Sequence, residues 1–209
     1  DEAYGFIGLY ICRPDMRGRG FGKSVWEAGM ALLSGRTIGL DGVEAQQANY
    51  RSMGFEPSYR TVRLSGWSVL PGEIPASVRP VTPDLLPAVA AFDRRCFPAS
   101  RSAFLKQWIK PPHVAMADVV DGAVRGYGVV RACREGFKIG PLFAADSRTA
   151  SALFAALQNS FDGDIHIDVP ETQAAFTHLL LDAGMSPGFE TMRMYRGPAP
   201  SLEPRQIFG

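Results

Sequence analysis

The sequence predicts a mixed α/β fold (α+β mixed) made of two copies of one unit, each a mixed sheet flanked by helices. Three observations predict this fold. An apolar segment, a Gly-rich turn and an amphipathic segment follow one another over residues 6–34; residues 66–77 have linker composition; and the elements after residue 137 repeat the order of those before residue 65. We therefore expect a first domain over 1–65, a linker over 66–77, a second domain over 78–197 and a tail over 198–209.

The first domain begins with a strand, a loop and a helix. Residues 6–12 are almost continuously apolar, which is typical of a central strand covered on both faces. Residues 23–34 place Val25, Ala28, Leu32 and Leu33 on one helical face, with Gly35 at the expected C-terminal cap. The pattern then predicts a strand at 38–40, a helix over about 46–53 and a strand at 61–64.

The second domain has a front half that the first lacks. Its pattern predicts a strand at 77–81, helices over about 84–95 and 102–108, and strands near 114–120 and 124–132. Residues 138–143 then resemble the first strand, and residues 151–158 form a helical face. The residues expected to be buried in this domain are Leu153, Phe154, Leu157, Phe176 and Leu179.

The order of these later elements indicates a repeat. Ile165-His166-Ile167-Asp168 parallels Ile38-Gly39-Leu40-Asp41, and Thr191-Met192-Arg193-Met194 parallels Thr61-Val62-Arg63-Leu64. Chance alignment of amphipathic elements is the alternative. If the repeat is real, the first copy lacks its front half, and we expect roughly sixty or more residues to precede Asp1, where the chain opens without Met.

Composition argues against several classes of protein. Apolar residues make up 46% and charged residues 21%, the formal net charge is +1, and no apolar run approaches the length of a membrane span. We therefore expect no nucleic acid and no membrane among the partners. Cys12, Cys96 and Cys133 lie far apart without a ligand motif, which favours the reducing cytoplasm and predicts no metal site.

The segment Arg17-Gly18-Arg19-Gly20-Phe21-Gly22-Lys23-Ser24 is the strongest candidate for a binding site. It lies between the apolar strand and a helix start, where backbone N–H groups are unpaired and the helix dipole is positive. Glycines let an anion approach the backbone, and the two arginines and the lysine add charge. A pyrophosphate is the natural ligand, and a merely basic, solvated turn is the alternative.

Three phosphate-loop patterns compete for this segment. The nucleotide-triphosphatase pattern GxxxxGK[ST] needs a glycine where Arg17 stands, and GxGxxG meets Lys23 or Val25 at its last glycine. The pattern [RQ]xxGx[GA] matches fully, with Arg17, Gly20 and Gly22. In this loop the sequence resembles the GNAT superfamily of N-acetyltransferases, a resemblance that implies a mostly antiparallel sheet flanked by helices.

The resemblance extends to both sides of the loop. Tyr10-Ile11-Cys12-Arg13-Pro14 resembles the family's strand before the loop, whose splayed backbone pairs with the pantetheine arm of acetyl-CoA, and Tyr50 precedes a Gly-Phe pair as in many members. The Asn and Ala that many members carry before this Tyr are replaced by Val43 and Gln46. The resemblance implies cofactor contacts at Tyr10, Ile11, Cys12, Arg17, Gly18, Arg19, Gly20, Phe21, Gly22, Lys23 and Ser24.

Tyr50 has two interpretations. The resemblance implies that its phenol protonates the departing thiolate as a general acid, with a backbone N–H near Cys12 polarising the thioester oxygen. The alternative is a Tyr packed in the core with its hydroxyl hydrogen-bonded. The second copy has neither the Gly-rich loop nor the tyrosine. Its turn at residues 144–149 has Asp146 and no glycine, and Leu180 stands at the position equivalent to Tyr50. We expect that copy to be degenerate.

The expected activity is transfer of an acetyl group from acetyl-CoA to an amine, on a small molecule or a peptide, by direct attack of the amine. A non-catalytic acyl-CoA sensor is the alternative, and a nucleotide triphosphatase is a distant third. The general base, the acceptor and the oligomeric state, a homo-oligomer included, stay open.

Overall fold

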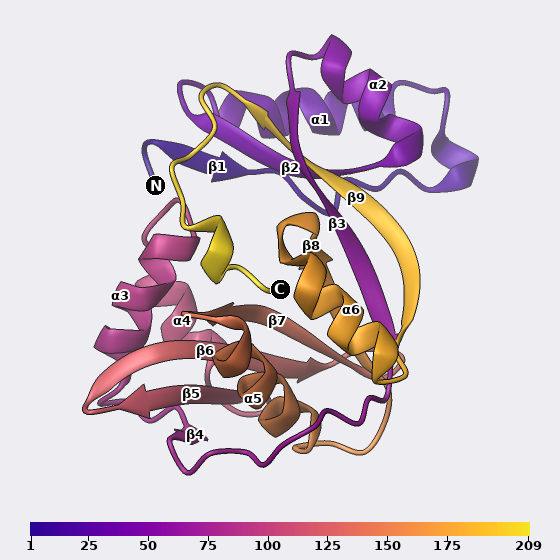
Figure 1. Ribbon diagram of the computed structural model, residues 1–209. Coiled ribbons are helices and arrows are strands. Elements are labelled where there is room, and N and C mark those ends of the chain that lie inside the picture. The colour runs from indigo at the N-terminus through magenta and orange to yellow at the C-terminus, as the bar shows by residue number, and fades with distance from the viewer. The chain divides into compact units, whose positions relative to one another are not determined.

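The computed structural model describes residues 1–209, which form two compact units (Figure 1). The first unit contains Asp1–Tyr59 and Thr191–Ser201, and the second contains Arg60–Glu190 and Leu202–Gly209. These ranges differ from those expected from the sequence, because two long strands, β3 (Glu56–Gly66) and β9 (Ser186–Arg196), each begin in one unit and end in the other. None of the helices is long and apolar enough to cross a membrane.

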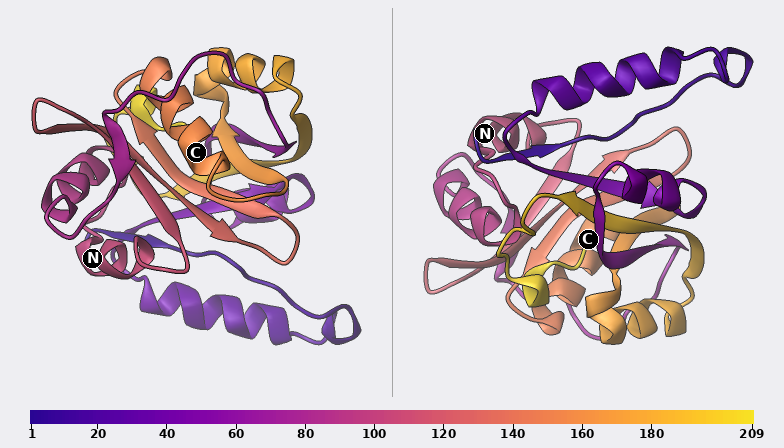
Figure 2. Two further views of the ribbon diagram at one scale, coloured as in Figure 1. Left: turned by 90° about the horizontal axis from the view of Figure 1, so that it is seen from below. Right: turned by 90° about the horizontal axis from the view of Figure 1, so that it is seen from above.

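The first unit is a small sheet with two helices. Its sheet has the order β1-β2-β9, with β1 parallel to β2 and the last six residues of β9 antiparallel to β2. Helix α1 runs back alongside β1 and the segment that follows it (Figure 2). A core of Trp26, Ile38, Leu40, Phe55 and Met194 joins helices and sheet. The elements are β1 (Tyr4–Phe6), a 3-10 turn (Pro14–Met16), α1 (Phe21–Leu32), β2 (Thr37–Val43) and α2 (Glu44–Ser52).

The second unit is a larger mixed sheet of order β3-β8-β7-β6-β5-β4, antiparallel except for the β7–β8 pair. Its strands are β4 (Val78–Pro80), β5 (Val114–Val120), β6 (Ala123–Ala132), β7 (Phe137–Ala144) and β8 (Ile165–Pro170). Its helices are α3 (Leu86–Cys96), α4 (Ser102–Trp108), α5 (Ser147–Gln158) and α6 (Ala174–Asp182), with 3-10 turns at Glu171–Gln173 and Pro204–Gln206. The helix expected at 102–108 and the strand expected at 114–120 are confirmed to the residue.

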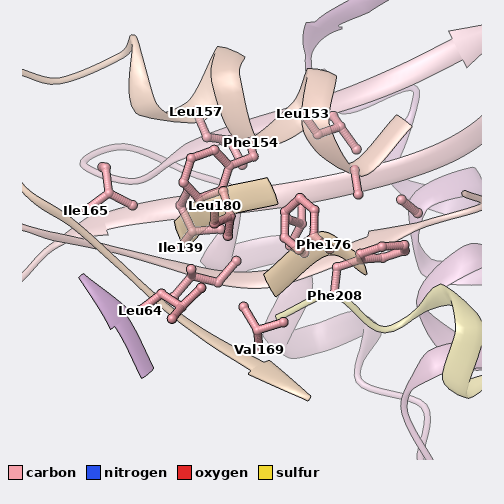
Figure 3. Packing of buried hydrophobic residues seen from close by; sticks show 14 of the residues in the cluster. Leu64, Ile139, Leu153, Phe154, Leu157, Ile165, Val169, Phe176, Leu180 and Phe208 are labelled. Atoms are coloured by element: carbon pink, nitrogen blue, oxygen red, sulfur yellow. The ribbon is translucent and has the colours of Figure 1, made fainter. Parts of the chain in front are cut away.

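Two apolar clusters hold this sheet between its helices. One joins α5 and α6 to β7 and β8 and contains Leu153, Phe154, Leu157 and Phe176, each at most 1% exposed (Figure 3). The other joins α3 and α4 to β5 and β6 around Tyr127 and Val129. The expected burial is therefore confirmed for these four residues, whereas Leu179 is only partly buried.

The predicted strand over residues 6–12 is wrong. Only Tyr4–Phe6 form a strand, because β1 lies at the edge of its sheet and loses its single partner, β2, after Gly39. The apolar residues that follow are exposed, Leu9 at 95% and Ile11 at 80%. The apolar composition of residues 8–12 predicted burial, but these residues have no neighbouring strand that would bury them.

The last part of the predicted tail over 198–209 packs into the second unit. Phe208 is only 1% exposed and belongs to the α5–α6 cluster, and residues 202–209 are part of the second unit. Backbone hydrogen bonds to β7 fix this segment in place, and such pairing has no periodic signature in so short a stretch.

Candidate functional site

The candidate site is a cleft of about 570 Å³ in the first unit, where β1 and β2 diverge. The two strands pair in parallel up to Phe6 and Gly39, and the Ile7 N–H donates a last hydrogen bond, of 3.0 Å, to the Gly39 carbonyl. Beyond this point the chain leaves β2 and forms the opposite wall. The cleft is lined by Ile7, Gly8, Leu9, Tyr10, Ile11, Cys12, Arg17, Trp26, Leu40, Asp41, Val43, Gln46 and Tyr50.

The Gly-rich loop ends at the start of α1, beside this cleft. Gly18 and Gly20 have φ angles of 73° and 84°, a region that favours glycine, and nothing lies within 4 Å of where a Cβ would stand on either. Gly20 is the N-cap residue of α1, and no side chain caps the helix. The first turn of α1 therefore presents N–H donors toward an open, glycine-lined approach, which is the arrangement that binds anions.

Gly22 has a different role from its neighbours. A Cβ at this position would lie 2.8 Å from the hydroxyl oxygen of Tyr10, so the glycine allows the Tyr10 ring to close over the start of α1. The same ring makes an edge contact with Trp26, with 5.4 Å between centroids. The third glycine of the loop thus brings the cleft wall against the helix.

The three cations of the loop differ in position. Arg17 lines the cleft, and its Nε donates a hydrogen bond of 3.1 Å to the carbonyl of Cys12. Arg19 lies over the ring of Phe21, 5.0 Å from its centroid, and Lys23 forms an exposed pair with Glu27 at 3.7 Å. Arg17 is therefore the cation that the structure brings into the cleft itself.

Tyr50, on α2, lies on the wall opposite residues 7–12. Its ring stacks on Trp26 with 5.5 Å between centroids and contacts the edge of Phe55. Burial raises the pKa of the Tyr50 phenol above its ordinary value, and the neighbouring Tyr10 adds to the rise. The phenol therefore keeps its proton at neutral pH, as a proton donor must.

Three residues of this cleft, two polar and one aromatic, were assigned no role from the sequence. Asp41 is the single carboxylate among the lining residues, Gln46 adds an amide, and Trp26 forms the floor between the two tyrosines. The helical periodicity of α1 was the available signal for Trp26. Asp41 had no such signal, because its role depends on strand pairing.

The structure therefore separates the sequence-predicted residues into two groups. Tyr10, Ile11, Cys12, Arg17 and Tyr50 line the cleft together. The others lie in the adjoining loop and the first turn of α1; these are Gly18, Arg19, Gly20, Phe21, Gly22, Lys23 and Ser24.

Comparison with known proteins gives concordant matches. The profile of the acetyltransferase (GNAT) domain family matches residues 89–209. A curated relative, the holothin acyltransferase of Pseudoalteromonas sp. (strain SANK 73390), is 31% identical over 210 residues, which cover 99% of this chain and 71% of the relative.

Two solved structures share the fold. A Pyrococcus horikoshii protein proposed to be an acetyltransferase superposes with a TM-score of 0.82 at 23% identity, over 100% of this chain and 70% of its own. A tandem GNAT protein from the clavulanic acid biosynthesis pathway superposes with a TM-score of 0.62 at 16% identity, over 95% of this chain and 77% of its own.

Proposed function

The chain belongs to the acetyltransferase (GNAT) domain family, and from that premise we propose that it transfers an acetyl group from acetyl-CoA to the amine of a small-molecule or peptide acceptor. Acyl transfer is the activity of the family. The acetyl group, the amine acceptor and the residues of the site are the parts that we propose for this chain.

The observation that carries the proposal is the uncapped, glycine-lined start of α1 beside a cleft between diverging strands. The pyrophosphate of CoA fits the N–H donors of the first turn, since Gly18 and Gly20 leave room for it and Arg17 supplies a positive charge. The rest of the cofactor then extends along residues 10–12 toward the point where β1 and β2 separate. The walls of the cleft there are mainly apolar, which suits the pantetheine arm.

The proposed reaction is a direct transfer. The amine nitrogen forms a bond to the thioester carbon, the carbon–sulfur bond breaks, and the thiolate leaves with a proton from the Tyr50 phenol. The ammonium nitrogen releases its extra proton to water, and a proton from solvent restores the phenol, so that no net proton is gained or lost. A backbone N–H near Cys12 would stabilise the negative charge that develops on the carbonyl oxygen. The Cys12 thiol is not required, since no acyl-enzyme is formed.

The name of the curated relative supports a small-molecule acceptor. That relative is a holothin acyltransferase, and the alignment spans nearly the whole of this chain. The polar residues on the β2 side of the cleft, Asp41 and Gln46, offer acceptors and donors of hydrogen bonds to such a molecule. We therefore place the acceptor on that side.

We further propose that the chain contains two GNAT copies and that the second, over residues 78–197, is degenerate. Equivalent ion pairs support the repeat: Arg193 stands directly opposite Asp41 between β9 and β2, and Arg63 stands directly opposite Asp168 between β3 and β8. Each arginine contacts its aspartate through two hydrogen bonds. The aligned segments that predicted the repeat contain these same four residues.

A titration with CoA tests the proposed site. We expect one molecule of CoA per chain by calorimetry, and Gly20→Asp should abolish binding because it sets a carboxylate against the phosphates. Gly122→Asp is the matched control, since Gly122 also has a positive φ, of 78°, and open space around it, in the β5–β6 turn. CoA binding that survives Gly20→Asp would contradict the assignment.

Turnover separates the enzyme from a sensor that uses the same loop. An acetyltransferase releases free CoA thiol from acetyl-CoA when an amine acceptor is present, and Gly20→Asp removes that release. A chain that binds CoA but releases no thiol with any amine of a broad panel would be a sensor instead.

A further inference from the structure

The strands β7 and β8 of the second unit diverge as β1 and β2 do in the first. They pair in parallel through Ile139 and Ile167 and then separate. In this unit the opening holds residues 207–209 of the chain itself. The Leu142 N–H donates a hydrogen bond of 2.7 Å to the Gly209 carbonyl, and the Phe208 and Gly209 N–H groups donate to the Leu142 carbonyl at 2.9 and 3.1 Å.

Side chains lock this segment in the opening. The Phe208 ring is 1% exposed and meets the ring of Phe176 edge-on, with 5.3 Å between centroids (Figure 3). A Cβ on Gly209 would lie 2.8 Å from two side-chain carbons of Ile167, so the backbone lies close against the wall formed by β8. The segment therefore fills the opening as an extended chain with one aromatic anchor.

The start of α5, which corresponds to the start of α1 in the first unit, is also occupied by a side chain of the protein. Helix α5 is capped by Asp146, whose carboxylate accepts a hydrogen bond of 2.8 Å from the Thr149 N–H and one of 2.6 Å from Arg125. The Thr149 N–H, with a smaller contribution from Arg125, holds the pKa of Asp146 below its ordinary value. A negative charge thus already stands at the start of this helix, where α1 has none.

The two openings correspond position by position. Ile7 is the last residue bonded to β2 and Ile139 the last paired with β8, so Tyr10 and Leu142 stand at equivalent positions beyond them. Around Tyr10 the chain is exposed and forms a cleft, whereas Leu142 is buried and bonded to residues 208–209.

We propose that the second unit carries a built-in replacement for acyl-CoA. Residues 207–209 occupy the place of its amide-bearing arm, and the Asp146 carboxylate occupies the place of a phosphate. The proposal rests on the proposed repeat and on the cofactor cleft of the first unit. The opening between β7 and β8 is then a groove for an extended amide chain. Residues 207–209 fill this groove in the full chain, and pantetheine should enter it when residues 203–209 are removed.

Hydrogen exchange at the Leu142 amide reports on this groove directly. A chain that ends at Leu202 should exchange this proton on the order of 100-fold faster than the intact chain, because the Gly209 carbonyl no longer accepts it. Millimolar pantetheine should slow the exchange in the shortened chain and leave the intact chain unchanged. A peptide of residues 203–209 added to the shortened chain should also slow it, and pantetheine should compete with that peptide.

Two further variants keep the result interpretable. Phe208→Ala in the full chain removes the anchor but keeps the backbone, and should speed Leu142 exchange even if the shortened chain does not fold. The experiments are made in the Gly20→Asp background, so that binding in the first unit does not contribute. CoA binding that survives Gly20→Asp would count against the proposed function alone, because the groove of the second unit is judged by Leu142 exchange.

Either of two results would overturn the inference. Leu142 exchange that is unchanged in both variants would mean that residues 207–209 do not occupy the groove in solution. Faster exchange that neither pantetheine nor the peptide slows would mean that the groove does not bind an extended amide chain.

Discussion

The guanidinium of Arg193 on β9 donates two hydrogen bonds, of 2.6 and 3.2 Å, to the carboxylate of Asp41 on β2. The two residues are direct partners across the strands, and the guanidinium also lies over the rings of Phe6 and Tyr59. Although burial lowers the pKa of Arg193, the charge of Asp41 outweighs it and raises the pKa above its ordinary value. A residue near the end of the sequence thereby fixes the single carboxylate of the cleft.

Removing this arginine should destabilise the first unit. Arg193→Met removes a guanidinium that is 21% exposed and leaves the Asp41 carboxylate, 37% exposed, without its partner, so the free energy of unfolding should fall by about 1–2 kcal/mol. Arg13→Met is the control, because Arg13 pairs with Asp15 at the surface with 77% of its side chain exposed, and should change stability by less than about 0.5 kcal/mol. Urea unfolding measures both, and equal effects would mean that the Arg193 pair is no more than a surface contact.

This pair also marks a limit of prediction from sequence. The parallel between the segments around Arg63 and Arg193 was visible, because it lies in the order of residues. The partners of these arginines were not, since each strand pairs with one more than 100 residues away and no local pattern specifies so distant a partner. The two compact units differ from the expected domain ranges for the same reason, as β3 and β9 each contribute residues to both units.

The candidate site could be predicted in part. Loop spacing singled out Arg17, the following Gly-Phe pair singled out Tyr50, and both residues line one cleft, while their roles stay predictions. The apolar run before the loop was interpreted as a buried strand, although Leu9 and Ile11 are exposed, because apolar composition cannot distinguish a core strand from the wall of a binding cleft. The burial of Phe208 likewise depends on contacts with residues distant in the sequence, such as Phe176, which the residues around Phe208 do not predict.

Tyr50→Phe tests whether the phenol is a general acid. The change keeps the ring stacked on Trp26 and removes the proton, so kcat should fall about 10²-fold while CoA affinity stays the same. Because burial raises the pKa of Tyr50, the alkaline limb of the kcat profile in the unaltered enzyme should lie above the ordinary tyrosine value of about 10.

Tyr10→Phe is the matched control for this prediction. Tyr10 also lines the cleft and also contacts Trp26, yet its proposed contribution to binding is through its backbone. Removing the Tyr10 hydroxyl should leave kcat within a few fold of the value for the unaltered enzyme. A large loss in Tyr10→Phe with none in Tyr50→Phe would assign the proton to Tyr10.

The second unit should tolerate a substitution on the exposed side of a helix but not a truncation in its core. Leu153→Ala empties a fully buried position on α5 and should cost about 2–5 kcal/mol of unfolding free energy, with CoA affinity of the folded protein unchanged. Arg148→Ala, five residues earlier on the exposed side, should alter neither quantity. Weaker CoA binding in Arg148→Ala would contradict the assignment of the cofactor to the first unit.

Acid should weaken the second unit through Asp168. Burial raises the pKa of this carboxyl, but its hydrogen bonds to Arg63 and its contact with Lys138 outweigh burial and hold the pKa below the ordinary value. A carboxyl with a depressed pKa in the folded state contributes stability in full above its unfolded pKa, about 3.9. That contribution is lost as the pH falls from there through the lower folded value.

Asp168→Asn should therefore change the shape of the acid profile as well as its height. At pH 7 the variant should be less stable, because Arg63 and Lys138 lose their counterion. Between about pH 4 and pH 2 its urea midpoint should fall less steeply than that of the unaltered protein, since the titrating group is gone. Asp15→Asn, at an exposed pair, should leave the slope unchanged. If both variants kept the slope of the unaltered protein, Asp168 would not be a source of its acid sensitivity, and the two cations would be neutralised by other groups.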